Sequence, residues 1–141
     1  MTAKEFLRSL RKMTLEIDAL REEVVLLRQE AEGVKAMTLS DMPKGGQPKD
    51  AAEIIAEVAD LQRTRYALTL ERMKKREQAM VVITRMEDGD QRAVLVMRYV
   101  LGKSWDDIVD EMHYSFATVF RLHGAALQSF EQHMQDESKR E

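Results

Sequence analysis

The residue types that most often carry catalysis are few in this chain and are poorly spaced for it. The three histidines, His113, His123 and His133, lie ten residues apart, which is not ligand spacing on one helical face. The absence of cysteine excludes disulfides, thiolate metal sites and a cysteine nucleophile. The acidic pair Asp106 and Asp107 suits the start of a helix, where adjacent side chains point in different directions. We therefore expect no enzyme, no metal and no cofactor.

The clearest functional pattern is a series of three predicted helices in the last third of the chain. Asp90 is the candidate N-cap of the first helix, and Gly102 follows its end. Ser104 is the candidate N-cap of a short helix over 105–112, and Ser115 that of the third helix. The inward residues expected on the last two helices are Trp105, Ile108, Val109 and Met112, then Val119, Leu122, Ala126, Leu127 and Phe130. A short helix, a tight turn and a capped further helix predict a helix-turn-helix.

A helix-turn-helix contacts DNA bases with the first two turns of its second helix, on the face away from the core. Here the candidate DNA-binding residues are Ser115, Phe116, Ala117, Thr118, Phe120, Arg121 and Gly124. Arg121 can donate to guanine or to a phosphate, and Phe116 or Phe120 can contact thymine methyl groups. The alternative is that Phe116 and Phe120 meet another protein.

The run LVMRYVLGKSWDDIVDEMHYSFATV resembles region 4 of the bacterial sigma-70 factors. The matching positions are Arg98 and Tyr99 for an Arg-Tyr pair, 107–109 for the middle helix, and Ser115, Thr118 and Val119 for the start of the recognition helix. The whole chain is similar to small phage proteins of Gram-positive bacteria grouped with the ArpU-like or RinA-like late-gene regulators. The resemblance implies contacts with promoter DNA, RNA polymerase or both. Two departures are His113, where sigma factors usually have Gly in the turn, and a recognition helix poor in Lys and Arg.

The charge distribution argues against tight DNA binding by the isolated chain. The net charge is −3, and residues 88–131 hold four bases against seven acids. We therefore expect few phosphate contacts and a shallow salt dependence of binding. A basic cluster at Arg72, Lys74, Lys75 and Arg76 is either a solvated helix face or a phosphate-contacting patch beside the helix-turn-helix.

The N-terminal segment, from Lys4 to about Met37, predicts one long helix with a coiled-coil seam. Apolar residues recur at alternating gaps of four and three: Phe6, Leu10, Met13, Ile17, Leu20, Val24, Leu27, Ala31 and Val34. The remaining positions, such as Arg8 and Arg11, predict a solvated charged surface. The seam must be buried either against a partner chain, giving a homo-oligomer, or against the next helix of the same chain.

Residues 38–50 predict a linker, because two prolines and a Gly-Gly pair end any helix. A second long helix is expected from Ala51 to about Met86, with Asp50 as its N-cap. The composition, 44% apolar and 33% charged, is typical of a helical protein. No apolar run reaches the length of a membrane span and the first residues do not resemble a signal peptide, so we expect a cytoplasmic protein of a bacterial host cell.

These patterns predict an all-α protein with a long N-terminal helical hairpin and a C-terminal helix-turn-helix domain. The expected domains are the hairpin over 1–79, the sigma region 4-like domain over 80–135 and a polar tail over 136–141. The expected function is a phage or prophage transcription regulator that binds double-stranded DNA, RNA polymerase or both and self-associates through its N-terminal helices. The alternative is a structural or packaging adaptor, such as a small-terminase-like helical oligomer that binds DNA.

Overall fold

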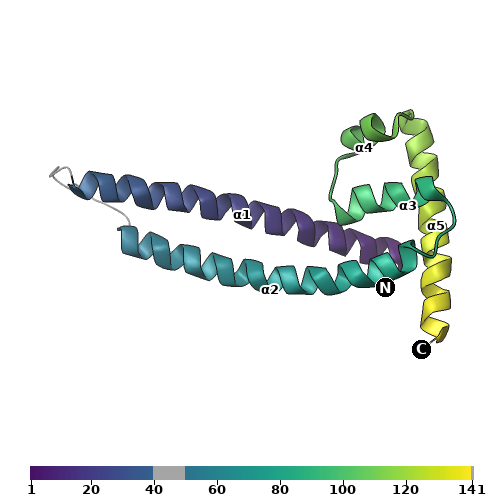
Figure 1. Cartoon of the computed structure of the whole chain (residues 1–141), viewed down its shortest axis with the longest axis horizontal. Helices are drawn as coiled ribbons and strands as arrows, with labels where there is room; N and C mark the ends of the chain where they lie inside the picture. The colour runs from purple at the N-terminus through teal and green to yellow at the C-terminus, as the bar shows by residue number, and fades with distance from the viewer. Residues whose placement is uncertain (40–49, 141) are drawn as a thin grey trace. The chain divides into compact units, whose positions relative to one another are not determined.

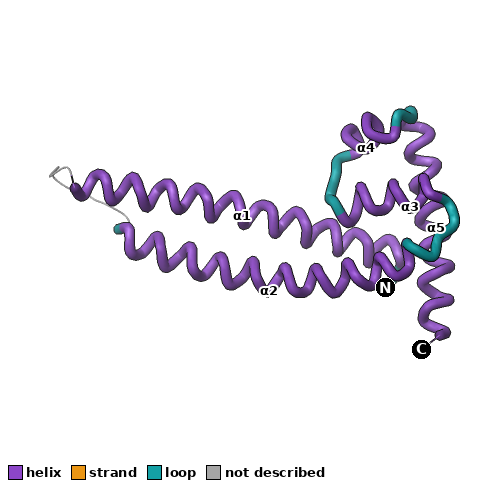
Figure 2. Tube along the Cα trace, viewed as in Figure 1, coloured by secondary structure: helices purple, strands orange, loops and turns teal. Residues whose placement is uncertain are grey.

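A computed structural model describes residues 1–39 and 50–140 of the chain (Figure 1). Within these ranges the protein is all-helical and contains no strand, as Figure 2 shows by colour. The elements are α1 (Ala3–Leu39), α2 (Ala51–Ile83), α3 (Gly89–Leu95), the π-helical turn η1 (Val96–Val100), α4 (Trp105–Met112) and α5 (Phe116–Arg140). The linker expected over 38–50 falls mainly on residues outside the described ranges. Residues 136–140, expected as a polar tail, continue α5 as helix.

The chain forms two compact units, one of Met1–Leu15 with Glu71–Glu141 and one of Glu16–Leu70. The long helices α1 and α2 each contribute to both units. This division differs from the boundary expected near residue 79, because the first turns of α1 belong with the C-terminal helices. The reason is that the first turns of α1 and the C-terminal helices share one hydrophobic core. No local sequence pattern predicts such long-range contacts.

In the unit of residues 16–70, α1 and α2 bury a common apolar cluster. Its members are Val24, Leu27 and Ala31 from α1 and Ile54 and Val58 from α2. From Val24 onward, the expected seam of α1 is therefore covered by the same chain. Asp50 is the N-cap of α2, as predicted, since its carboxylate accepts a hydrogen bond of 2.8 Å from the Glu53 amide.

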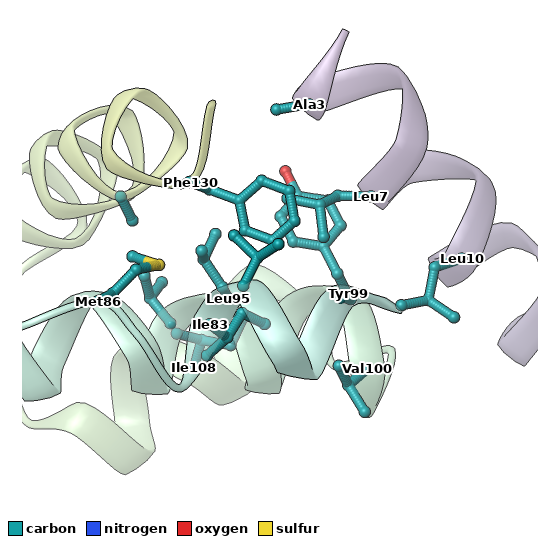
Figure 3. Packing of buried hydrophobic residues seen from close by; sticks show 14 of the residues in the cluster. Ala3, Leu7, Leu10, Ile83, Met86, Leu95, Tyr99, Val100, Ile108 and Phe130 are labelled. Carbon is teal, nitrogen blue, oxygen red and sulfur yellow. The ribbon is translucent and has the colours of Figure 1, made fainter. Parts of the chain in front are cut away.

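The unit of residues 1–15 and 71–141 has a larger core, shown in Figure 3. Phe130 of α5 is fully buried and lies beside Leu7 of α1 and Leu95 of α3. The Phe6 ring also stacks on Phe130, with 6.5 Å between the ring centroids. Other large side chains that are fully buried are Leu10, Ile83, Met86, Val94, Ile108 and Val119. Since α1 supplies Ala3, Leu7 and Leu10 to this core, its first turns belong to the same unit as α3, α4 and α5.

The buried stripe of α1 changes register within this unit. The sequence pattern placed Phe6 and Met13 in the seam, but both are only half-buried, and Leu7 and Thr14 are buried instead. A two-helix seam covers a narrow stripe, whereas a helix inside a multi-helix core is covered over a wider face. The buried Thr14 hydroxyl is satisfied, because it donates to the Leu10 carbonyl at 3.1 Å and accepts from Arg72 Nε at 2.7 Å.

The prediction that Asp90 caps the next helix is wrong, because the N-cap of α3 is Asp88, two residues earlier. Asp88 has an extended backbone (φ −84°, ψ 120°) and accepts a hydrogen bond of 2.9 Å from the Gln91 amide. Asp90 lies inside α3 and instead accepts from the Tyr114 hydroxyl at 2.7 Å. Gly102 follows η1 with φ +75°, so the left-handed residue expected there is confirmed.

Candidate nucleic-acid interface

The segment from α4 to α5 is organised by two hydroxyl caps and one left-handed residue. Ser104 Oγ accepts from the Asp107 amide and Ser115 Oγ from the Thr118 amide, each at 3.2 Å, so both predicted caps are confirmed. Between them His113 ends α4 with φ 60°. A non-glycine residue at this φ carries a conformational cost, and the main-chain bond from the His113 amide to the Val109 carbonyl helps to hold it.

The residues predicted to contact DNA form an open face on the first turns of α5. Ser115, Phe116, Ala117, Phe120, Arg121 and Gly124 are exposed, and Thr118 is half-buried. A Cβ added at Gly124 would meet no atom within 4 Å, so this side of the helix is free of the rest of the described chain. The spacing of the exposed residues places them on one side of the helix. The side chains named from the sequence are therefore brought together.

Hydrogen bonds among three of these residues hold the start of α5. The Ser115 hydroxyl donates to Thr118 Oγ1 at 3.0 Å, and Arg121 Nη2 donates to the same oxygen at 3.4 Å. An arginine has five N–H donors. Most of the N–H donors of Arg121 therefore take no part in these hydrogen bonds and are available to a ligand.

Aromatic rings pack against one another within and beside the open face of α5. Phe116 and Phe120 are 46% and 47% exposed and lie 6.2 Å apart between centroids. Phe120 also lies 5.0 Å from the ring of Trp105, and the Arg98 guanidinium lies 4.4 Å from the Trp105 ring centre on α4. Phe120 is thus fixed by packing while nearly half of its surface stays open.

His123 belongs to the packing rather than to the open face. Its Nε2 shares a hydrogen bond of 2.6 Å with the Tyr99 hydroxyl, and its ring lies 4.7 Å from that of Trp105. Burial, with the nearby positive charge of Arg98, lowers the pKa of His123 to about 4. Burial also raises the pKa of Tyr99. At neutral pH the His123 ring is therefore uncharged, and its contacts with Tyr99 and Trp105 hold α5 in place.

A basic hollow of about 460 Å³ lies beside these rings, and sequence reasoning missed it. Four bases and a leucine of α1 form one wall: Lys4, Arg8, Arg11, Lys12 and Leu15. Five residues of the C-terminal helices form the rest: Arg98, Tyr99, Trp105, Phe120 and His123. The signal in the sequence was the spacing of the four bases at i, i+4, i+7 and i+8, which places them on one helical face without an acid among them.

The basic cluster of α2 is divided between structural and exposed positions. Arg72 donates to Thr14 Oγ1 at 2.7 Å and to the Val100 carbonyl at 2.8 Å. The Lys75 ammonium donates to Ser9 Oγ at 2.7 Å. Lys74 and Arg76 are exposed. Half of this cluster thus holds α1 and η1 in place, a role that neither expectation from the sequence included.

Two of the four bases counted near the open face are already engaged. Lys103 Nζ contacts both carboxylate oxygens of Glu111 at 2.7 Å. Arg92 donates to the Met86 carbonyl at 2.6 Å. The other two have weaker contacts, since Arg98 donates to the Lys103 carbonyl at 3.1 Å and Arg121 donates to Thr118 Oγ1 at 3.4 Å. Neither pairs with a carboxylate in the described part of the chain. The described residues contain no cluster of His, Cys, Asp and Glu that could hold a metal ion. None of their helices combines the length and the apolarity needed to span a bilayer.

These features define an all-α protein with an open, capped helix face beside a basic hollow. Residues 34–131 match the model of a family described as proteins of unknown function, DUF1492, and the chain belongs to this family. No curated protein matches the chain, and no solved structure does.

Proposed function

We propose that this protein is a DNA-binding transcription regulator of a phage or prophage. In this proposal α4 and α5 act as a sigma region 4-like helix-turn-helix, and α1 with α2 acts as a helical hairpin. The observation that carries it is the open face of α5, where Phe116, Arg121 and Gly124 lie exposed directly after a capped turn. An exposed recognition helix that follows a short helix and a tight turn is how such proteins enter the major groove.

The exposed side chains suit contact with base edges. Arg121 has donors free for guanine or for a phosphate oxygen, and the exposed rings of Phe116 and Phe120 suit thymine methyl groups. Gly124 adds no side chain, so the DNA backbone can approach the second turn of α5 closely. Ser115 contributes by fixing where the helix begins.

RNA polymerase is the second partner in this proposal. Residues 88–131 hold four bases against seven acids, and Lys103 is paired with Glu111, so these helices alone offer too few phosphate contacts for strong binding. Docking on polymerase or pairing of two copies would raise the effective concentration at a promoter. The stacked, half-exposed pair of Phe116 and Phe120 has the aromatic character of a protein-docking site and favours a polymerase contact there.

A structural or packaging adaptor is the alternative function, and one observation favours it. Ile55, Tyr66 and Leu70 are 50%, 67% and 44% exposed and lie on one side of α2. Such a stripe suits self-association into a helical oligomer. In that case DNA binding would depend on the number of copies rather than on base contacts by α5.

The discriminating variant is Arg121→Ala, because this side chain is exposed and its loss leaves the core intact. Losing one specific guanine contact costs about 1–3 kcal/mol, so promoter affinity should fall roughly 5- to 150-fold and reporter output should fall with it. Lys139→Ala, exposed on the last turn of the same helix, is the matched control. Footprinting with and without RNA polymerase measures both variants. Equal regulation by Arg121→Ala and the unchanged protein would reject base contact through α5.

A further inference from the structure

The basic hollow concentrates positive charge without a matching acid. Lys4, Arg8, Arg11 and Lys12 enter it from α1, and Arg98 enters from η1. Among the described residues, no acidic side chain lines it. Within the described residues none of these five bases forms an ion pair with a carboxylate. Arg11 and Arg98 bond only to the carbonyls of Gly102 (3.4 Å) and Lys103 (3.1 Å). The charge of the hollow is therefore uncompensated.

The repulsion between these cations is unfavourable and helps to lower the pKa values of neighbouring groups. Burial and the charge of Arg11 lower the pKa of Arg98. Arg98, Lys4 and Arg8 add to the burial that lowers the pKa of His123. Arg11 Nε is buried and has no hydrogen-bond partner among the residues that the structure describes. An anion in the hollow would relieve the repulsion and could accept from donors that now lack partners.

The chemistry of the lining fits a phosphate group. Guanidinium forks match the oxygens of a phosphate, and lysines add point charge around it. The rings of Trp105 and Phe120 form an apolar wall that reduces water access and strengthens charge attraction. A volume of about 460 Å³ lies within the usual range of ligand pockets. Phe120 belongs both to this wall and to the open face of α5.

We infer that the basic hollow binds a phosphate group, carried either by a DNA strand lying against α5 or by a free nucleotide. Binding of a DNA strand rests on the proposed function, whereas binding of a free nucleotide does not. With DNA bound, the four bases of α1 join Arg98 and Arg121, so the chain has about six candidate phosphate contacts. That number exceeds what the C-terminal helices alone offer.

The single tryptophan of the chain, Trp105, lines the hollow, so its fluorescence reports binding there directly. The full-length protein is titrated with AMP, with adenosine as the phosphate-free control, at constant ionic strength. In a second arm it is titrated with a short fluorescent DNA duplex over a series of salt concentrations. AMP tests the free phosphate ester, and the duplex tests the strand.

The test variant is Arg8→Gln with Lys12→Gln. Both side chains are exposed and form no hydrogen bond within the described residues, so folding should be unaffected, and circular dichroism verifies this. The matched control is Arg21→Gln with Lys35→Gln, which removes two positive charges from exposed positions elsewhere on α1. Any effect of net charge alone should appear equally in both double variants.

If the hollow binds a strand phosphate, the test variant lowers the slope of log affinity against log salt by about 1.8, and the control leaves it unchanged. From about 50 to 200 mM salt, the unchanged protein should then lose roughly tenfold more affinity than the test variant. If the ligand is a free nucleotide, AMP changes Trp105 fluorescence saturably, adenosine does not, and the test variant abolishes the effect.

The failures are distinguishable. Duplex binding that is equal in the test and control variants, without an AMP response, overturns the inference and leaves the proposed function standing. An AMP response that requires Arg8 and Lys12, without any duplex binding, supports the hollow as a site for a free phosphate ester, and the footprinting with RNA polymerase then decides the proposed function. If neither ligand binds, the inference is rejected, and the footprinting with RNA polymerase decides the proposed function independently.

Discussion

At the scale of single residues, His123 has the most testable chemistry. Its pKa is about 4 in the folded protein and near 6.5 as an unperturbed group. The unfolded chain therefore takes up a proton first as the pH falls, so His123 costs stability between about pH 6.5 and pH 4 and has no effect above that window. Replacement of His123 by glutamine removes this loss of stability at low pH and retains a polar group beside Tyr99.

We therefore predict that the urea midpoint of the unchanged protein falls more between pH 7 and pH 5 than that of His123→Gln. His133→Gln, which changes another histidine of α5, serves as the control and should behave like the unchanged protein. Carboxylates titrate in the same range in every variant, so the difference between variants is the measured quantity. Identical pH dependence in all three would contradict the burial of a neutral His123.

Some helix caps could be predicted from the sequence, whereas other caps and the hydrogen bonds between distant residues could not. The caps at Ser104 and Ser115 were predictable, because a cap depends on a few neighbouring residues. The choice between Asp88 and Asp90 was not, since both precede the same helical pattern and Tyr114, a distant residue, binds Asp90. The hydrogen bond between Tyr99 and His123 likewise joins two elements and has no local signature.

At the scale of elements, α1 shows the limit of periodicity. Its length was predictable from the heptad pattern, and so was the burial of Val24 and Leu27. Its first turns were assigned the wrong stripe, because the pattern cannot show how many helices surround each turn. The same limit hid the basic hollow, since Arg8 and Arg11 were expected on a solvated surface and instead line the hollow with residues of α4 and α5.

Substitution of leucines tests the register of α1. Leu7 is fully buried in the core of the C-terminal helices, Leu20 is half-buried, and Leu26 is 54% exposed. Leu7→Ala should lower the free energy of unfolding by about 2–5 kcal/mol. Leu20→Ala should cost less, and Leu26→Ala should be close to neutral. Urea denaturation of the three variants measures this order. A larger loss at Leu20 than at Leu7 would restore the stripe expected from the heptads.

At the scale of the whole molecule, the all-helical class and the order of the elements followed from composition and periodicity. The union of residues 1–15 with residues 71–141 did not, because it depends on contacts between parts of the chain far apart in sequence. The sequence also predicted the exposed face of α5, whose outward positions follow from helix geometry. The spacing of the four bases of α1 was visible in the sequence, but their place beside α4 and α5 was not, because it depends on contacts between distant segments.

Self-association is the remaining expectation for the whole molecule, and the unit of residues 16–70 bears on where it would occur. The seam of α1 from Val24 is already buried against α2, so an oligomer formed through that seam would have to open it. The exposed side of α2, with Ile55, Tyr66 and Leu70, needs no such rearrangement. We therefore expect copies to associate through this side of α2 rather than through the α1 seam.

Tyr66→Lys with Leu70→Lys should give a monomer of unchanged stability, because both side chains are exposed and the new charges repel across the contact. The control, Thr64→Lys with Ala67→Lys, adds the same charge on exposed positions further around α2 and should keep the mass of the unchanged protein. Light scattering after size-exclusion chromatography, over a range of concentrations, measures the mass. If self-association raises promoter affinity, the monomeric variant should also bind paired sites more weakly. A monomeric unchanged protein at every concentration would leave RNA polymerase as the partner that supplies the missing affinity.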